Sequence, residues 1–328
     1  AEALEAGIAA SDIGWIKGTC VKGKPEVWDE DTLVLPEYSR IAEEKEAYCD
    51  SFALQYRNND AITGKRLIEQ YDNHTVVIQN LPQMPLEREE LDYNYELPYE
   101  YGCPPAYAEE VPAIREVKFS LTSCRGCFGG CGFCALTYHQ GREVRSRSQE
   151  SLVKEAERLT TFPDFKGYIH DVGGPTANFR KPACKKQEHH GVCRDRDCLY
   201  PQPCDQMIVD HGEYLDVLKA IRQVEHVKKV FIRSGIRYDY VLADRDDTFI
   251  EELCENHVSG TLKVAPEHVS PNVLAQMRKP DIQVFLDFAD RFRRANEERS
   301  LRQYLIPYMI SSRPGSKLED AVDLAVFL

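Results

Sequence analysis

The stretch CRGCFGGCGFC, residues 124–134, places four cysteines and four glycines in eleven positions. Three of these cysteines have the spacing C-x3-C-x2-C, namely Cys127, Cys131 and Cys134. A 4Fe-4S cluster normally takes four thiolates, so three from one short loop would leave one iron open. An open iron can bind a small molecule through an amine and a carboxylate. The glycines between the cysteines accept positive φ and carry no Cβ, which would let the loop wrap closely around a cluster.

A structural zinc site is the alternative for this stretch, with Cys124 as the fourth ligand. Structural zinc commonly uses two C-x2-C pairs separated by a longer loop, and eleven residues are few for closing all four ligands. The position also favours a cluster, because chemistry in parallel α/β folds gathers at the carboxyl ends of strands. The stretch follows a strand expected at 116–123. We therefore expect an iron–sulfur cluster, with Cys124 as a bystander.

From residue 114 onward, expected strands and helices alternate along the chain. The strands are expected at 116–123, 166–172, 228–235, 260–267 and 302–311, and the helices at 148–159, 212–224, 246–257, 270–277, 282–296 and 317–328. Successive βα units imply parallel strands joined by crossover helices. The pattern of about five units predicts an α/β protein with either a (βα) barrel or a doubly wound sheet. Because the chain starts with Ala and stops inside the fifth helix, we expect a fragment truncated at both ends.

Residues 1–113 predict a mixed α/β segment ahead of the barrel. A helix is expected at 37–56, with an apolar face formed by Ile41, Tyr48 and Phe52. A strand is expected at 74–80, followed by a connector rich in proline and tyrosine at 81–107. The tyrosines of the connector could stack on a ligand, or they could cover neighbouring structure.

Composition narrows the class of protein. With 328 residues, 42% of them hydrophobic and 29% charged, the chain resembles ordinary soluble proteins. A net charge of −13 argues against a dedicated nucleic-acid binder, whose surface would be basic, although an RNA substrate is not excluded. No apolar run is long enough to span a bilayer and no signal peptide begins the chain, so no membrane partner is indicated. Twelve cysteines then indicate metal or redox groups in the reducing cytoplasm.

A second cysteine group interrupts the strand–helix alternation as an insertion at about 180–206. It has the spacing C-x8-C-x4-C-x5-C and consists of Cys184, Cys193, Cys198 and Cys204. A polar loop that contains proline cannot build a core, so we expect metal binding to order it. A second iron–sulfur cluster and a zinc site both remain open. Four isolated cysteines are expected to be small buried hydrophobes: Cys20, Cys49, Cys103 and Cys254.

Several motifs resemble a known family. CFGGCGFC resembles the radical SAM signature, in which an aromatic residue precedes the third cysteine, as Phe133 does. DVGGP, residues 171–175, resembles the glycine motif that receives the amino group of S-adenosylmethionine (SAM) in that superfamily. RGCFGGCGFCALTYHQGR, KKVFIRSGIRYD and LKVAPEHVSPNVLAQM are similar to the YgiQ family of radical SAM proteins, and this similarity extends over nearly the whole chain.

The resemblance implies a partial barrel of the radical SAM type at 114–328. Residues 1–113 would be the tail of a cobalamin-binding-like amino-terminal domain and a linker. The implied function is a radical SAM enzyme that binds a 4Fe-4S cluster through Cys127, Cys131 and Cys134. It would cleave SAM reductively to a 5′-deoxyadenosyl radical, with an electron donor such as flavodoxin or ferredoxin. The family has no firmly assigned reaction, so the substrate stays unknown. The alternative is an iron–sulfur or zinc-stabilised binding protein without SAM chemistry.

The resemblance also implies contacts with SAM, and no catalytic residue beyond the cluster ligands. The implied cofactor-binding residues are Phe133, Gly173, Gly174, Pro175, Ser234, Glu267 and Arg278. The backbone carbonyls of the two glycines would take the amine, and Arg278 would meet the carboxylate. Further polar candidates at strand ends are Asp171, Arg237, Lys263 and His268. For the polar residues, salt bridging at the barrel rim is the alternative role.

Overall fold

The computed structural model describes residues 2–24, 31–71 and 74–328 as a mixed α/β protein. The chain forms two compact units. Residues 1–85 and 185–194 make up the smaller unit, and residues 86–184 and 195–328 make up the larger one. The boundary predicted at 113/114 therefore lies within the larger unit, and the cobalamin-binding-like fold of the amino-terminal segment stays a prediction.

The smaller unit is built on a four-stranded mixed sheet with the strand order β1-β4-β3-β2. Its elements are α1 (Glu2–Glu5), η1 (Ala10–Asp12), β1 (Cys20–Gly23), β2 (Thr32–Val34), α2 (Tyr38–Glu43), α3 (Lys45–Arg57), β3 (Arg66–Gln70), β4 (Val76–Gln79) and α8 (Lys185–His190). The strand predicted at 74–80 is confirmed as β4. β3 pairs with β4 antiparallel and with β2 parallel.

The single helix predicted at 37–56 is wrong in two respects. The structure has two helices, because Glu44 adopts an extended conformation (φ −111°, ψ 117°) between α2 and α3. The predicted apolar face is also wrong, since Tyr48 and Phe52 are exposed while Ala47 and Ser51 are buried. Small side chains allow α3 to pack closely, and the large aromatic rings lie on its outer side.

The larger unit contains the alternating strands and helices that the sequence predicts. Its elements are α4 (Arg88–Tyr95), α5 (Ile114–Val117), β5 (Ser120–Thr122), β6 (Cys124–Arg125), α6 (Leu136–Gln140), β7 (Arg145–Ser146), α7 (Gln149–Thr160), β8 (Tyr168–Ile169), β9 (Asp171–Gly173), α9 (Gly212–Arg222), β10 (Lys229–Val230), α10 (Tyr238–Ala243), α11 (Thr248–Glu252), the π-helical turn η2 (Leu253–His257), β11 (Thr261–Glu267), α12 (Pro271–Met277), α13 (Ile282–Glu298), β12 (Tyr304–Met309) and α14 (Leu318–Phe327). Three strand pairs are parallel, β5–β9, β8–β10 and β11–β12.

The first three predicted strands are joined into one ladder by backbone hydrogen bonds. The His170 N–H donates to the Phe119 carbonyl at 2.8 Å, and the Val172 N–H donates to the Phe231 carbonyl at 3.2 Å. β5 is shorter than predicted because residues 114–117 are helical. The described strands form separate sheets and not a closed barrel, as expected for a partial βα fold.

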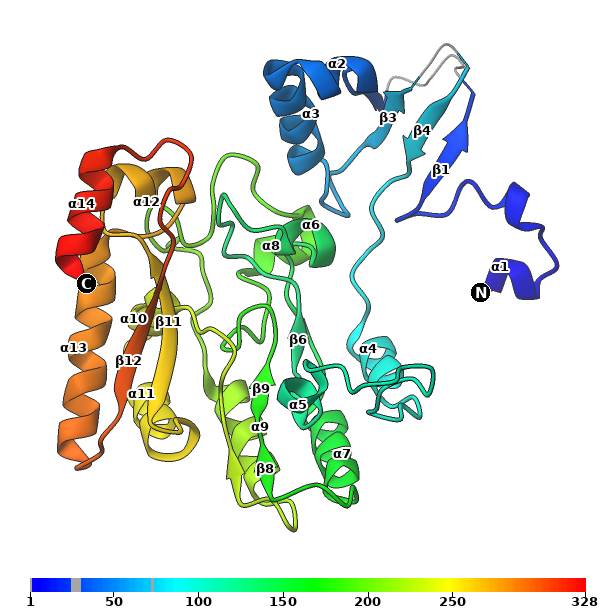
Figure 1. Ribbon diagram of the computed structural model, residues 1–328. Coiled ribbons are helices and arrows are strands. Elements are labelled where there is room, and N and C mark those ends of the chain that lie inside the picture. Colours follow the sequence, from blue (N-terminus) through cyan, green and yellow to red (C-terminus); the bar gives the residue numbers. More distant parts are fainter. Residues whose placement is uncertain (1, 25–30, 72–73) are drawn as a thin grey trace. The chain divides into compact units, whose positions relative to one another are not determined.

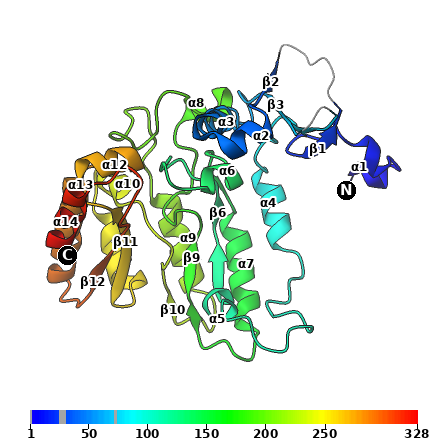
Figure 2. The same ribbon diagram turned by 45° about the horizontal axis from the view of Figure 1, so that its top comes forward.

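The core of this unit lies between the strands and the helices that follow them. Leu121 of β5, Ile169 of β8, Val230 of β10 and Val264 of β11 are buried in one cluster with residues of α7, α9, α11 and α13. Figures 1 and 2 show the strands running toward the end of the unit where α6 and α12 lie. The loops at these carboxyl ends include the cysteine stretch, which is therefore positioned by the first strand of the series.

The connector predicted at 81–107 contains a helix that the sequence pattern did not predict. Helix α4 begins after Glu87, which forms a capping box with Glu90. The connector tyrosines pack on arginines near α7: the Arg147 guanidinium lies 4.3 Å from the ring centre of Tyr95. The Tyr101 hydroxyl donates to Glu155 Oε1 at 2.7 Å. These contacts favour the covering role of the tyrosines, because they fasten the connector to α7.

The isolated cysteines are less uniformly buried than predicted. Cys254 is buried and Cys103 is half-buried, but Cys20 and Cys49 are exposed. The prediction is therefore wrong for these last two cysteines. Among the described residues, no helix is long and apolar enough to cross a membrane.

Candidate radical SAM site

The cysteine loop follows β5 directly and is largely removed from solvent. Cys127 is buried, and Cys131 and Cys134 are half-buried. The Cys134 N–H donates to the Cys131 carbonyl at 3.1 Å, which forms a tight turn between these two residues. Cys127 Sγ lies 3.5 Å from the Thr176 hydroxyl. Burial raises the pKa of the Cys127 thiol, and the Thr176 hydroxyl opposes that effect.

Glycines of the loop make room for close neighbours. A Cβ at Gly129 would lie 2.6 Å from Arg237 Nη1 and 3.3 Å from Cys127 Sγ. Gly130 has a φ of +66°, and a Cβ there would lie 2.8 Å from Asp197 Oδ1. The left-handed backbone and the close approach both exclude larger residues. The loop therefore needs glycine for its shape and for its contacts.

Cys124 differs from the other three cysteines of the stretch. It lies in β6, which pairs antiparallel with β7, and its side chain is fully buried. Its thiol donates to the Thr176 carbonyl at 3.8 Å. Burial raises the pKa of Cys124 to about 11. Its place in a strand pair and its contact with the Thr176 carbonyl give Cys124 a packing role, and its role as a bystander of the cluster stays a prediction.

Arg237 lies behind the cysteine loop and is nearly inaccessible to solvent. Its Nε and Nη2 donate to the two carboxylate oxygens of Asp239 at 2.8 and 2.5 Å. Its Nη1 donates to Cys131 Sγ at 3.4 Å. Burial alone would lower the pKa of Arg237, but the Asp239 carboxylate outweighs that effect and the pKa is raised. A charged guanidinium therefore contacts one of the predicted cluster ligands.

The second half of the cysteine-rich insertion contacts the cysteine loop through Asp197. This buried carboxylate accepts from Arg142 Nη2 at 3.1 Å and from Arg278 Nη1 at 3.1 Å. It also fills the space beside Gly130. Arg278 has left-handed backbone angles (φ 54°) at the end of α12. Its guanidinium lies on the insertion, where an ion pair accounts for it, and its contact with a SAM carboxylate stays a prediction.

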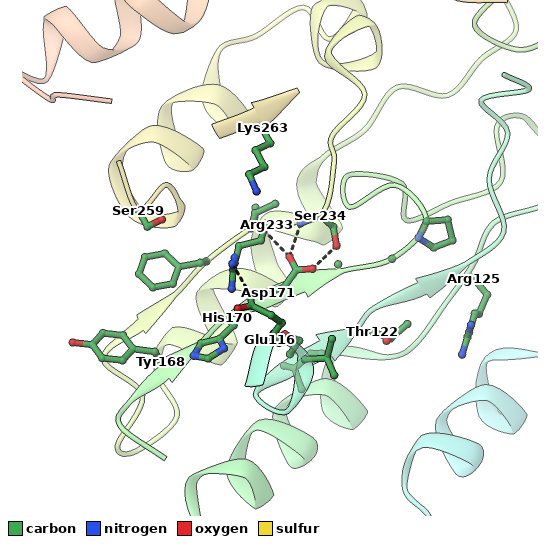
Figure 3. Close-up of a pocket in the computed structure, with 18 of the residues that line it drawn as sticks. Glu116, Thr122, Arg125, Tyr168, His170, Asp171, Arg233, Ser234, Ser259 and Lys263 are labelled. Carbon is green, nitrogen blue, oxygen red and sulfur yellow. Dashed lines mark hydrogen bonds and ion pairs between the residues drawn. The ribbon is translucent and has the colours of Figure 1, made fainter. Parts of the chain in front are cut away.

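A cavity of about 1100 Å³ extends along the inner side of the strands (Figure 3). Of the predicted SAM-binding residues, Gly173, Gly174, Pro175 and Ser234 line it. Asp171 Oδ1 accepts the N–H groups of Arg233 at 2.8 Å and Ser234 at 3.1 Å, and its Oδ2 accepts the Ser234 hydroxyl. Asp171 therefore ties the glycine motif to the strand that follows it in the ladder.

The cavity wall carries cations from several strands. Figure 3 shows Lys263 extending into the cavity from β11, and Arg125 on the far side from Lys263. Arg233 is paired with Glu116 at 2.8 Å. Both Lys263 and Arg125 are exposed to the cavity. An anionic ligand group is therefore favoured in this space.

Other predicted residues lie apart from that cavity. Phe133 is covered by Arg313, whose guanidinium lies 5.6 Å from the ring centre. Glu267 has a φ of +75° and lies buried 3.9 Å from Lys279 Nζ. Burial raises the pKa of Glu267 and lowers that of Lys279. The attraction between the two charges at 3.9 Å therefore does not compensate for their loss of hydration. Glu267 Oε2 has no hydrogen-bond partner within the described part of the chain.

The second cysteine group is divided between the two units. Cys193 belongs to segment 185–194 of the smaller unit, and the larger unit contains Cys184, Cys198 and Cys204. The Cys204 N–H donates to the Cys198 carbonyl at 2.9 Å. A second iron–sulfur cluster or zinc site at these residues stays a prediction.

The donor set of the cysteine loop consists of three thiols, the kind of ligand that a 4Fe-4S cluster takes. In residues 2–24, 31–71 and 74–328, no three His, Cys, Asp or Glu side chains gather around a point that could hold one metal ion. A cluster makes a different demand, because it takes one thiolate at each of several irons. Three thiols on a glycine-lined turn, one of them touching a guanidinium, meet that demand.

Sequence reasoning missed several residues that shape this site. Asp197, Arg142, Lys279 and Asp239 were not among the candidates, although all four are buried around the loop. The DRD run at 195–197 showed acidic residues in the insertion, but only the fold shows which carboxylate faces inward. The sequence identified Arg237 as a strand-end residue, and the structure places it against sulfur.

Two family models match this chain. The family model described as "Radical SAM superfamily" matches residues 121–324, and "Radical SAM N-terminal" matches residues 1–120. The chain therefore belongs to the radical SAM superfamily, and this membership implies a 4Fe-4S cluster and SAM-dependent radical chemistry.

Within that superfamily, the relatives are UPF0313 proteins, the YgiQ-type family. One from Clostridium perfringens (strain 13 / Type A) is 51% identical over 332 residues, covering 100% of this chain and 50% of the relative. Another from Clostridium botulinum (strain Okra / Type B1) is 48% identical over 327 residues, covering 99% and 51%. The chain thus spans about half the length of the curated relatives it matches.

Proposed function

We propose that the chain binds a 4Fe-4S cluster through Cys127, Cys131 and Cys134 and binds SAM in the adjoining cavity. The observation that carries this proposal is the parallel register of β5 and β9, which pairs Thr122 with Gly173. The cysteine loop leaves the first of these strands and the glycine motif leaves the second. Both motifs therefore start side by side at the carboxyl end of one sheet, where ligands bind in parallel α/β folds.

The residues of the cavity divide the recognition of SAM among them. The Gly173 carbonyl already accepts the Ser123 N–H at 2.6 Å, so its second lone pair and the Gly174 carbonyl are the acceptors for the SAM amine. Lys263 supplies a positive charge for the carboxylate. Ser234, held by Asp171, is oriented toward the same space. Ser234 and the Gly173 carbonyl are held in place before the ligand arrives, which lowers the entropic cost of binding.

When bound, the cluster supplies one electron for reductive cleavage of SAM to methionine and a 5′-deoxyadenosyl radical. The protein contributes binding, orientation and exclusion of water. Burial of the cysteine loop and the close glycine contacts serve the last of these roles. We further propose that a flavodoxin or ferredoxin supplies the electron. An iron–sulfur or zinc protein without SAM chemistry is the alternative that the experiment below separates.

The test is anaerobic reconstitution with iron and sulfide, followed by electron paramagnetic resonance of the reduced protein with and without SAM. We expect a 4Fe-4S signal that changes when SAM is added, together with release of 5′-deoxyadenosine. The triple variant Cys127→Ala/Cys131→Ala/Cys134→Ala should lose that signal. Cys124→Ala is the matched control, because it removes a buried thiol from the same stretch and should retain it.

Two outcomes would refute the proposal. A cluster signal insensitive to SAM would leave an iron–sulfur protein without SAM chemistry, and bound zinc without iron would leave a metal-stabilised binding protein. Iron that survives in the triple variant would instead identify a second cluster at Cys184, Cys193, Cys198 and Cys204.

A further inference from the structure

We infer that Arg237 is a positioning residue that donates a hydrogen bond to the Cys131 thiolate and raises the reduction potential of the cluster. This inference rests on the proposed function, since it requires a cluster at Cys127, Cys131 and Cys134. Its starting point is the 3.4 Å contact between Arg237 Nη1 and Cys131 Sγ. This contact brings a buried positive charge directly onto one of the three sulfurs.

The guanidinium is held rigidly in this position. Asp239 occupies Nε and Nη2 through a two-point contact, which leaves Nη1 directed at the sulfur. The backbone of Arg237 is fixed as well, because its N–H donates to Asn178 Oδ1 at 2.9 Å and its carbonyl accepts from Asn178 Nδ2 at 3.3 Å. Both charged side chains are buried, so neither can turn toward water. Asp239 therefore both balances the charge of the Arg237 guanidinium and fixes its orientation toward Cys131.

Gly129 provides a second observation on the same guanidinium. A Cβ at this position would lie 2.6 Å from Arg237 Nη1, closer than real Cβ contacts occur. Gly129 has no positive φ that would by itself require glycine. Its lack of a side chain is explained by the approach of the guanidinium to the cysteine loop. The absence of a side chain at Gly129 therefore leaves the space that the Arg237 guanidinium occupies beside the cysteine loop.

The expected electronic effect follows from the charge of the donor. A hydrogen bond to a cluster sulfur withdraws electron density, and it stabilises the reduced, more negative cluster. Arg stays protonated at all usable pH values, so the effect does not depend on titration. Lys279 adds a second buried cation nearby, but Glu267 lies 3.9 Å from it and partly offsets its charge. Among the described residues, Arg237 is the cation that touches the sulfur.

The experiment is a redox titration of the reconstituted full chain, followed by electron paramagnetic resonance without SAM. Arg237→Lys retains the charge but cannot reach Asp239 and the sulfur together. The double variant Arg237→Met/Asp239→Leu removes the buried pair without leaving one charge unpaired. In both variants we expect the equilibrium constant for reduction of the cluster to fall about tenfold relative to wild type. For a one-electron couple this is a decrease in the reduction potential of about 59 mV.

Arg147→Lys is the matched control, because Arg147 is also a buried arginine paired with an acid, Glu155, and has no sulfur contact. It should leave the potential unchanged. Gly129→Ala provides a second route, since its Cβ displaces the guanidinium while Arg237 and Asp239 stay in place. We expect a fall in potential in the same direction.

The outcomes separate this inference from the proposed function. A wild-type chain that takes up no cluster would overturn both. A wild-type chain with a SAM-sensitive cluster, and variants with full iron content and an unchanged potential, would overturn the role of Arg237 alone. An equal shift in Arg147→Lys would do the same, because the effect would then come from a general loosening of the core.

Discussion

Replacing Gly174 by alanine should destabilise the larger unit through a single contact with Cys124. The new Cβ would lie 2.5 Å from Cys124 Sγ and 3.1 Å from the Cys124 carbonyl oxygen. Cys124 is fully buried, so its sulfur has no space into which to move. Overpacking of this kind costs about 1–3 kcal/mol. For a unit of this size, about 2 kcal/mol corresponds to a decrease in Tm of about 4–8 °C.

Cys124→Ala offers a way to isolate that contact. On its own it removes one buried atom, at a cost of roughly 0.5–1.5 kcal/mol by comparison with loss of a buried methyl group. In the double variant Gly174→Ala/Cys124→Ala the new Cβ enters the space that Sγ leaves. We expect the two changes to couple favourably by about 1–2 kcal/mol. Rescue should be incomplete, because the contact with the carbonyl at 3.1 Å remains.

The assay is thermal unfolding followed by circular dichroism on wild type, both single variants and the double variant. Gly235→Ala is the matched control, since no atom lies within 4 Å of the position its new methyl group would take and its φ is ordinary. The reasoning is refuted if Gly174→Ala unfolds at the wild-type temperature. It is equally refuted if the double variant loses the sum of the two single effects.

Three further predictions concern neighbouring groups. Asp197→Asn breaks the buried ion pair with Arg142 at a cost of about 3–5 kcal/mol, together with the ion pair to the half-exposed Arg278; hydrogen exchange at 126–134 should accelerate, and unchanged protection would contradict this. Cys124, with its pKa raised to about 11, should react with iodoacetamide about 100-fold more slowly than a thiol of pKa 9; labelling at the rate of exposed Cys49 would exclude the protonated thiol. Because the folded pKa is raised, the stability that this thiol contributes is present below about pH 9 and is lost as the pH rises toward 11. Asp171→Ala removes the acceptor of the Arg233 and Ser234 N–H groups, at about 0.5–1.5 kcal/mol each because both groups remain accessible to water; calorimetry on the loaded protein should show SAM affinity reduced by tenfold or more, and an unchanged affinity would remove Asp171 from the site.

Local patterns predicted the framework of the larger unit well. Helix α7 was expected at 148–159 and lies at Gln149–Thr160, because its apolar stripe and the Ser148 cap are both local signals. Helices α9 and α13 follow the same logic. Helix α10 was missed, since the aromatic and β-branched residues of Tyr238–Ala243 also suit a strand. The break between α2 and α3 was missed because no proline or glycine marks Glu44.

The site could be predicted only in its local part. Cysteine spacing and glycine content are properties of a short segment, so the loop at 124–134 could be recognised directly. The contacts of Asp197 with Arg142 and Arg278 depend on tertiary structure. The sequence contains many other charged residues that could form such ion pairs equally well. For the same reason, the sequence did not reveal the ion pair between Arg278 and Asp197, and the contact of Arg278 with SAM stays a prediction. Burial decides between such partners, and no local pattern encodes burial for a charged residue.

The ion pairs of Asp197 with Arg142 and Arg278 determine when the cysteine loop becomes packed during synthesis of the chain. Cys127, Cys131 and Cys134 leave the ribosome before Asp197 and Arg278, the residues that give the loop its lateral support. At ~5–20 residues per second, the interval between residues 134 and 278 lasts about 7–30 s. During that time the three thiols are present without the packing that excludes water. If the proposed cluster binds at these cysteines, a nascent chain stopped before residue 197 should take it up poorly.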